Sequence, residues 1–276
     1  MSRMNGGRKM KKILCMMLAL CMIFALCACG QSAAPAAEEK TTFIMGIDPE
    51  YPPFSYLGND GNYAGFDVEI CQAVCDSLGW ELKIFGVNWD EKLVQLDARE
   101  CDCVWSGMTI LDSMKEAGYV ISAPYYDNTQ VLVVKSDSGF TSSADLAGKI
   151  VAVQLGTSGE ALLGGDLADL ASSFSSILTC DSFLKCFTEL EGGAVDAVFV
   201  DLPVAASYVA GKDNLDIIDE NLGAEQYGIA FRSSDAELCA KVEAAVAELV
   251  ANGTYAKIAS KPEYAEIVNN LIFLGD

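Results

Sequence analysis

An alternation of strand-like and helix-like segments occurs twice in the chain and constrains its fold more than any other feature. The first pass predicts elements at 41–48, 66–79, 81–87, 90–98 and 101–107, and the second predicts them at 149–154, from 158 onward, and at 174–178, 182–190 and 195–201. Strands that alternate with helices form mainly parallel sheets through right-handed crossovers. The sequence therefore predicts an α/β protein with two open α/β lobes.

Two short β-prone stretches, residues 129–138 and 226–235, lead into polar turns and are predicted to be the hinge crossings between the lobes. With these crossings, lobe one is expected to comprise residues 41–133 plus 229–276, and lobe two residues 134–228. Ligands of open α/β sheets bind outside the carboxyl ends of the strands, which here face each other. The cleft between the lobes is therefore the predicted functional site.

Residues 1–28 predict an export signal peptide. They contain five basic residues and no acidic residue, and their apolar run is too short to span a bilayer as a stable helix. The run ends in Leu26-Cys27-Ala28-Cys29, which resembles a bacterial lipobox, where the final cysteine is acylated. We therefore expect a lipidated Cys29, a flexible tether over 29–40, and anchoring to the outer face of the cell membrane. An ordinary signal peptide that contains cysteines is the alternative.

Composition argues against several other classes of function. The net charge is −21, so binding of nucleic acid through a basic surface is not expected, because an acidic chain repels phosphate. The chain has no histidine, which is the commonest catalytic base and a frequent zinc ligand. A hydrolase or a metalloenzyme is therefore not predicted, and no cofactor or metal is expected.

Eleven cysteines suggest a disulfide framework until the export segment is removed. Three leave with the signal and Cys29 would carry lipid, so seven remain, and an odd number means that at least one is free. Cys71 and Cys75 lie one helical turn apart on a predicted helix. Cys101 and Cys103 alternate on a predicted strand, so packing in the core accounts for both pairs. A metal site formed by the two pairs is the alternative.

Seven sequence segments occur in a fixed order: DPEYPPFSY (48–56), GFDVEI (65–70), SGMTI (106–110), SAPYY (122–126), DLAGKIVAVQLGTS (145–158), VDAVFVDLP (195–203) and QYGIAF (226–231). Together they resemble the polar amino-acid-binding proteins of ABC importers, bacterial solute-binding proteins of family 3. The resemblance runs from about residue 42 to the C-terminus. It implies the type II periplasmic-binding-protein fold and a monomeric, non-enzymatic receptor that delivers a polar amino acid to an ABC permease.

The resemblance also implies which residues contact the ligand. Tyr51 and Trp89 would be the aromatic walls on its two faces, and a Trp in a polar loop suits this role. Asp48 and Gln154 match positions that contact the ligand side chain, where an acid favours a cationic or amide-bearing group. Packing in the core is the alternative for the two aromatic residues.

Five further residues match family positions that hold the backbone groups of the ligand. The positions for its carboxylate are Gly107, Thr109, Thr157 and Ser158. Ser158 opens a predicted helix, whose unpaired N–H groups favour an anion. Asp201 ends a predicted strand and matches the position that pairs with the amino group. Capping of a helix is the alternative for Ser158 and for Asp201.

One departure from the family pattern concerns the ligand carboxylate. The family has an Arg that forms a bidentate bond with this group, but the present chain has Met114 there. Lys115 is adjacent, but it would leave a helix about 100° away. Either another group supplies the charge or the ligand lacks an α-carboxylate.

Two other functions are alternatives on the same fold. One is an enzyme similar to prephenate or arogenate dehydratases, which needs a general acid and a cationic site for a dicarboxylate. The missing Arg argues against this enzyme. The other is a sensor module, which is normally fused to a membrane span and a kinase.

Overall fold

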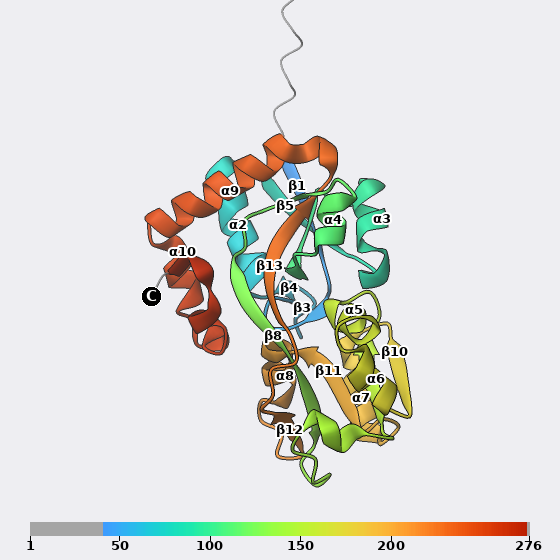
Figure 1. The fold of residues 1–276 in the computed structure, drawn as a ribbon. Helices are drawn as coiled ribbons and strands as arrows, with labels where there is room; N and C mark the ends of the chain where they lie inside the picture. The colour runs from blue at the N-terminus through green and yellow to red at the C-terminus, as the bar shows by residue number, and fades with distance from the viewer. Residues whose placement is uncertain (1–40, 275–276) are drawn as a thin grey trace, which may run out of the picture. The chain divides into compact units, whose positions relative to one another are not determined.

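The computed structural model describes residues 41–274, so the predicted signal peptide and tether lie outside the described residues. The first strand–helix pass is confirmed and forms the core of lobe one (Figure 1). Its parallel strands are β5 (Glu81–Gly86), β1 (Thr42–Ile47) and β6 (Cys103–Thr109), in this order. Its helices are α2 (Phe66–Leu78) and α3 (Lys92–Asp97), with a short 3₁₀ turn at Trp89–Glu91 before α3.

The second pass is also confirmed and forms the core of lobe two. Its parallel strands are β10 (Ser176–Cys180), β9 (Ile150–Gln154) and β11 (Ala197–Asp201), with β9 in the middle. Its helices are α5 (Ser158–Gly164), α6 (Ala168–Ser173), α7 (Phe183–Gly192) and α8 (Leu202–Val209). As in the first pass, each strand after the first is reached through at least one helix, which explains the parallel pairing.

Two long strands join the lobes. The first part of β8 (Tyr126–Lys135) pairs antiparallel with β13 (Ala224–Phe231), and the remainder of β8 pairs with β11. Because β13 also pairs with β6, one sheet of ten strands runs through the described part of both lobes. Figure 1 shows β8 and β13 side by side where they pass between the lobes. The lobe limits at residues 133 and 229 stay a prediction.

Several short elements are not predicted by the sequence. A small antiparallel sheet consists of β2 (Glu50–Tyr51), β3 (Ser55–Leu57) and β4 (Tyr63–Ala64). The other short elements are α4 (Asp112–Glu116), β7 (Val120–Ile121) and β12 (Leu215–Ile218). Elements of two to five residues are too short for hydrophobic periodicity to reveal. The small sheet nevertheless matters, because it fixes the loop that carries Tyr51.

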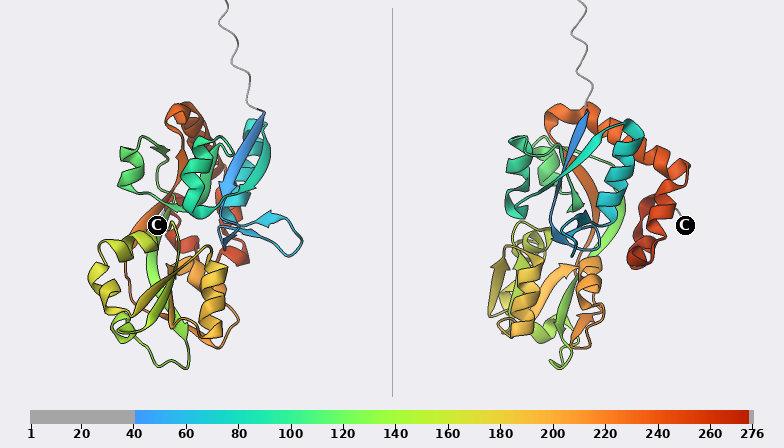
Figure 2. Two further views of the ribbon diagram at one scale, coloured as in Figure 1. Left: turned by 90° about the vertical axis from the view of Figure 1, so that its right-hand side faces the viewer. Right: turned by 180° about the vertical axis from the view of Figure 1, so that it is seen from behind.

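The C-terminal helices return to lobe one. Helices α9 (Ala236–Ala251) and α10 (Thr254–Ala259) both contact α2, and Figure 2 shows them on one side of that lobe. The chain therefore re-enters lobe one after the second crossing. Within residues 41–274, no helix combines the length and the apolar character that a membrane span requires.

The cysteines belong to the hydrophobic core. All seven cysteines of the described region are buried and none of them forms a disulfide. On α2, Cys71 and Cys75 belong to the same buried cluster as Phe66, Ile70 and Val74. The part of the chain that the structure describes contains no group of three potential metal ligands. Core packing therefore accounts for these residues.

Candidate functional site

A narrow cavity of about 30 Å³ lies between the lobes, where strands β6 and β11 reach their carboxyl ends. Lobe one lines it with Tyr51, Trp89, Lys92, Gly107, Met108, Thr109, Leu111 and Met114, and lobe two lines it with Gly156, Thr157, Ser158 and Asp201. Seven of the nine ligand-binding residues that the resemblance implies belong to this set. The fold thus brings together side chains that are far apart in the sequence.

The two predicted aromatic walls lie parallel to each other. The ring centroids of Tyr51 and Trp89 are 6.4 Å apart and their planes differ by 11°. Atoms in van der Waals contact are about 3.5 Å apart, so two rings need about 7 Å between them to hold a planar group. The observed pair is close to that spacing. Trp89 also belongs to a buried apolar cluster with Leu96 and Met108, so it packs in the core as well as facing the cavity.

A buried carboxylate holds the cavity wall at Gly107. The Gly107 N–H donates to Asp67 Oδ2 over 2.8 Å, and the Tyr125 hydroxyl donates to the same oxygen over 2.7 Å. Burial raises the pKa of Asp67 from 3.8 to about 7. Gly107 has a φ of +53°, and a Cβ added to it would lie 2.3 Å from Tyr51 Cε1. Glycine is therefore required between Asp67 and the Tyr51 ring.

Asp201 is the centre of a buried hydrogen-bond network. Its Oδ1 accepts hydrogen bonds from Asn128 Nδ2 at 2.7 Å, from Gln130 Nε2 at 2.8 Å and from the Tyr227 hydroxyl at 2.7 Å. Glu225 Oε1 accepts from the same two amides, over 2.7 and 2.9 Å. Burial, and then repulsion from Glu225, raises the pKa of Asp201 well above 3.8. Two carboxylates therefore share one pair of amide donors.

This network favours a cationic group in the ligand. A positive charge beside the two carboxylates would reduce their repulsion and the cost of burying Asp201. The Tyr51 hydroxyl lies 2.8 Å from the Tyr227 hydroxyl, so the network reaches the aromatic pair. Asp201 immediately precedes α8, but its side chain makes no capping hydrogen bond to that helix. Capping therefore does not explain the carboxylate.

Thr157, rather than Ser158, caps helix α5, which corrects the capping alternative considered for Ser158. Thr157 Oγ1 accepts from the Glu160 N–H over 3.2 Å and donates to the Gln154 carbonyl over 2.7 Å. Ser158 is the first residue of the helix, and its Oγ accepts from Gln130 Nε2 over 3.3 Å. The two N–H groups of Gln130 make shorter bonds to Asp201 and Glu225. The Thr157 hydroxyl is therefore occupied by the cap, whereas the Ser158 hydroxyl keeps its proton to donate.

Asp48 and Gln154 are bonded to each other and are not among the residues that line the cavity. Gln154 Nε2 donates to Asp48 Oδ2 over 2.8 Å, from lobe two to lobe one, and both side chains are buried. Burial raises the pKa of Asp48. Contact of either side chain with a ligand, as the resemblance implies, would require this bond between the lobes to open.

Lys92 is a cavity residue that the sequence analysis does not identify. Its Nζ donates to the Trp89 carbonyl over 3.0 Å and, from lobe one to lobe two, to the Gly156 carbonyl over 2.7 Å. The same nitrogen lies 4.8 Å from the centroid of the Trp89 ring, within cation–π range. The signal that could have revealed it is its spacing of three residues from Trp89, which places both side chains on one helical face.

Comparison with known proteins agrees with this arrangement. Residues 43–261 match the family described as bacterial extracellular solute-binding proteins, family 3. The chain belongs to this family. The resemblance inferred from the seven sequence segments is therefore confirmed.

This family 3 solute-binding protein is similar to two relatives of known name and to one solved structure. It is 33% identical over 227 residues to the L-cystine-binding protein TcyJ of Escherichia coli (strain K12), covering 81% of this chain and 83% of TcyJ. It is 34% identical over 255 residues to the arginine-binding extracellular protein ArtP of Bacillus subtilis (strain 168), covering 91% of this chain and 98% of ArtP. An ABC uptake transporter substrate-binding protein from Streptococcus pneumoniae with bound histidine has a TM-score of 0.75 at 26% identity, over 79% of this chain and 90% of that chain. The fold is thus that of type II periplasmic binding proteins, with two α/β lobes.

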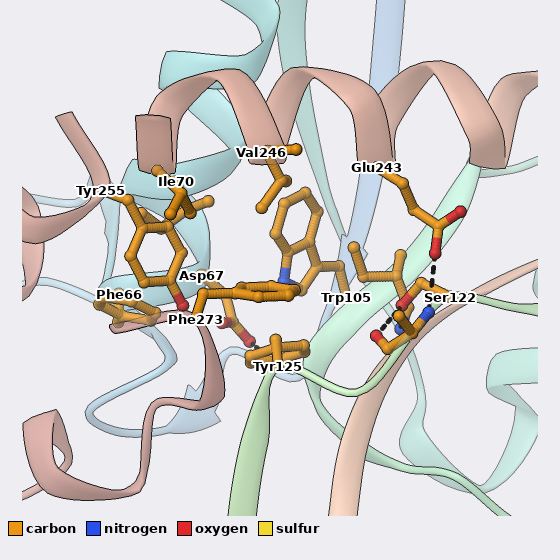
Figure 3. Close-up of a pocket in the computed structure, with 14 residues that line it drawn as sticks. Phe66, Asp67, Ile70, Trp105, Ser122, Tyr125, Glu243, Val246, Tyr255 and Phe273 are labelled. Atoms are coloured by element: carbon orange, nitrogen blue, oxygen red, sulfur yellow. Dashed lines mark hydrogen bonds between the residues drawn. The ribbon is translucent and has the colours of Figure 1, made fainter. Parts of the chain in front are cut away.

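This solute-binding protein has a second, larger cavity in lobe one (Figure 3). Its volume is about 290 Å³, and it shares no lining residue with the interlobe cavity. Its wall is mainly apolar and includes Phe66, Val246 and Phe273, while Figure 3 shows the Asp67 carboxylate close to Tyr125. A charged, polar solute would lose most of its hydration against this wall, whose polar atoms are few. The interlobe cavity is therefore the better candidate for a solute site.

Replacing Gly107 with Ala is expected to destabilise this solute-binding protein by about 2 to 5 kcal/mol, from the cost of a positive φ and from overlap of the new methyl with a packed ring. Gly79→Ala is the matched control, because Gly79 has a φ of +69° with nothing within 4 Å of an added Cβ. The control should lose only the stability that an Ala at positive φ costs. Denaturant unfolding measures both variants, and equal losses in the two would contradict the close approach of Tyr51 to Gly107.

Proposed function

We propose that this protein is an extracellular receptor that captures a polar amino acid between its lobes and delivers it unchanged to an ABC permease. The observation that carries the proposal is the meeting of a parallel aromatic pair with a buried carboxylate in one interlobe cavity. The aromatic faces suit an extended side chain, and Asp201 suits an ammonium group. The names of the relatives state cystine and arginine as ligands, and the solved structure holds histidine; each of these molecules carries an α-ammonium group.

Capture of a solute requires the lobes to separate and to close again. A cavity of about 30 Å³ is too small for an amino acid, so the solute cannot enter without movement. Hydrogen bonds join the lobes beside the cavity, from Gln154 to Asp48 and from Lys92 to the Gly156 carbonyl. Rotation about strands β8 and β13 would break these bonds and open the site. Closure over the solute would form them again, and the closed receptor would then dock, as a monomer, on the permease.

Calorimetric titration of the purified protein with arginine, histidine and cystine tests the proposal, with glucose as a control. We expect at least one of the amino acids to bind, and at a hundred times its Kd to add about 2.7 kcal/mol to the free energy of unfolding. No binding of any amino acid, together with turnover of prephenate, would reject the proposal in favour of the enzymatic alternative.

We also propose that Cys29 anchors the receptor to the membrane through lipid, as the Leu26-Cys27-Ala28-Cys29 pattern indicates. Replacing Cys29 with Ala is expected to release most of the protein into the medium, because the tether over 29–40 would then carry no lipid to hold it in the membrane. Cys27→Ala, two residues before the acylated position, is the control and should stay with the membrane. Fractionation of cells that express each variant measures the outcome, and membrane retention of Cys29→Ala would refute the lipid anchor.

A further inference from the structure

The interlobe cavity is lined by one basic side chain, Lys92, and by one carboxylic acid, Asp201. Their hydrogen-bond partners differ. Asp201 accepts from side chains of β8 and β13, whereas Lys92 donates to the carbonyls of Trp89 and Gly156. The cavity wall therefore carries a basic group and an acidic group at two separate places. Once a ligand ammonium group favours the ionised form of Asp201, this pattern is complementary to a zwitterion.

The Lys92 ammonium has a donor to spare. A lysine has three N–H donors, and carbonyl oxygens of Trp89 and Gly156 take two of them. Burial lowers the pKa of Lys92 to about 8, and the charge of Asp90 partly opposes this decrease. The ammonium group is therefore mainly charged at pH 7. Carbonyl oxygens solvate a cation without cancelling its charge. An anion in the cavity would therefore be a favourable additional partner.

The position of Lys92 also suits a carboxylate. Gly156, whose carbonyl it contacts over 2.7 Å, directly precedes Thr157 and Ser158 in the cavity wall. Of these two residues, Thr157 donates its hydroxyl proton to the Gln154 carbonyl, whereas the contact of Ser158 Oγ with Gln130 Nε2 leaves the Ser158 proton available. The positive charge of Lys92 thus lies beside a residue that can donate to the same anion.

The alternative cation near the cavity is less suitable. Met114 lines the cavity with an apolar side chain and is 5% exposed. The Lys115 side chain next to it is 54% exposed and forms an ion pair with Asp112 over 3.5 Å. Lys115 is not among the residues that line the cavity. An anion held there by Lys115 would lie in solvent, where the attraction is weak.

We propose that Lys92 binds the carboxylate of the amino-acid ligand and takes the part of the arginine that Met114 replaces. This inference rests on the proposed function and assigns one residue that gives the receptor its preference for a ligand carboxylate. One turn of the chain would then supply both an aromatic face, from Trp89, and the group that recognises the carboxylate. The positive charge comes from Lys92 at the start of α3, whereas the family arginine would lie on α4. The sequence position of that arginine therefore does not point to Lys92.

The test compares an amino acid with its own methyl ester, which has the same side chain and ammonium group but no carboxylate charge. Arginine and arginine methyl ester are titrated into wild type, Lys92→Met and Lys92→Arg; if histidine or cystine binds instead, it and its methyl ester are used. We expect wild type to bind the acid at least tenfold more tightly than the ester. Lys92→Met should weaken binding of the acid tenfold or more and of the ester less than threefold. Lys92→Arg should restore the preference for the acid.

Lys115→Met is the matched control and should behave as wild type. Loss of the acid preference in Lys115→Met, with none in Lys92→Met, would overturn the assignment. Equal weakening of acid and ester in Lys92→Met would also overturn it, because a bond that only closes the lobes serves both ligands alike, and the amino-acid function would stand. Tighter binding of the ester than of the acid by wild type would indicate a solute without a carboxylate. Binding of none of the three amino acids by wild type would reject the proposed function, and this inference with it.

Discussion

Replacing Asp201 with Asn is expected to weaken binding of arginine, histidine or cystine by roughly a hundredfold or more, since breaking a buried charge pair costs at least about 2 to 5 kcal/mol. The variant should nevertheless fold well. An Asn oxygen can still accept the hydrogen bonds that Asn128, Gln130 and Tyr227 donate to Asp201 Oδ1. Asn cannot ionise, so a loss of affinity would report the pairing of an ionised Asp201 with the ligand's ammonium group.

The unfolding of the same variant has a predictable pH dependence. The pKa of Asp201 is raised in the folded protein, so the folded state keeps a proton that the unfolded state has lost. Wild type should therefore lose stability as the pH rises from about 4, the unfolded pKa, up to the folded pKa. Asp201→Asn should lose less and be the more stable protein at pH 8. A ligand ammonium favours the ionised carboxylate, so binding to wild type should release a proton.

Calorimetry in buffers of different ionisation enthalpy measures the released proton, and denaturant unfolding at several pH values measures the stability. Asp216→Asn is the control, because Asp216 is exposed on β12. It should change neither affinity nor stability. A large loss of stability in Asp201→Asn with unchanged affinity would identify Asp201 as a structural residue rather than a ligand partner.

Asp67 is expected to make stability fall by about 4 kcal/mol as the pH rises from about 4 to about 7, because each unit of pKa difference corresponds to about 1.4 kcal/mol. The sign follows from the folded pKa of about 7, which lies above the unfolded value near 3.8. Between these values the folded state binds more protons than the unfolded state. The contribution is therefore complete at low pH and lost as the pH rises through 7.

The difference between wild type and Asp67→Asn isolates this contribution from that of Asp201. The stability of Asp67→Asn should fall less steeply between pH 4 and 7, and ligand affinity should also change, because Asp67 holds the Gly107 N–H. Asp76→Asn, an exposed position on the same helix, is the control and should keep the wild-type slope. Parallel pH profiles for wild type and Asp67→Asn would contradict a proton held by buried Asp67.

The secondary structure could be predicted where the periodic segments are long. Phe66, Ile70 and Val74 recur at helical spacing, and all three are buried on α2 as expected. The sheet formed by β2, β3 and β4 could not be predicted, because strands of two or three residues are held by their cross-strand bonds rather than by a pattern of their own. The loop that carries Tyr51 therefore has a conformation that its local sequence does not indicate.

The cavity could be predicted in part. Sequence motifs indicate residues such as Tyr51, Trp89 and Gly107, because a motif keeps the residue types that a site requires. Motifs do not indicate what the side chains do in the folded protein. Thr157 uses its hydroxyl as a helix cap, and Asp48 bonds Gln154 in the other lobe. These contacts depend on how close the two side chains lie in the folded protein. Neither of the two sequence segments determines that distance by itself.

The sequence by itself determines that this protein has two α/β lobes, a cleft between the carboxyl ends of their strands, and the residue types of the family's ligand site. Hydrophobic periodicity and local motifs are enough for these conclusions, since each is a property of neighbouring residues. The tertiary structure alone decides that Lys92 enters the cavity, that Glu225 shares amide donors with Asp201, and that Asp67 supports Gly107. Each of these contacts joins residues more than 20 positions apart, which only the folded chain brings within hydrogen-bond distance. For Asn128 and Glu225, the antiparallel pairing of β8 with β13 does this. That proximity arises from the tertiary fold and leaves no periodic signal in the chain.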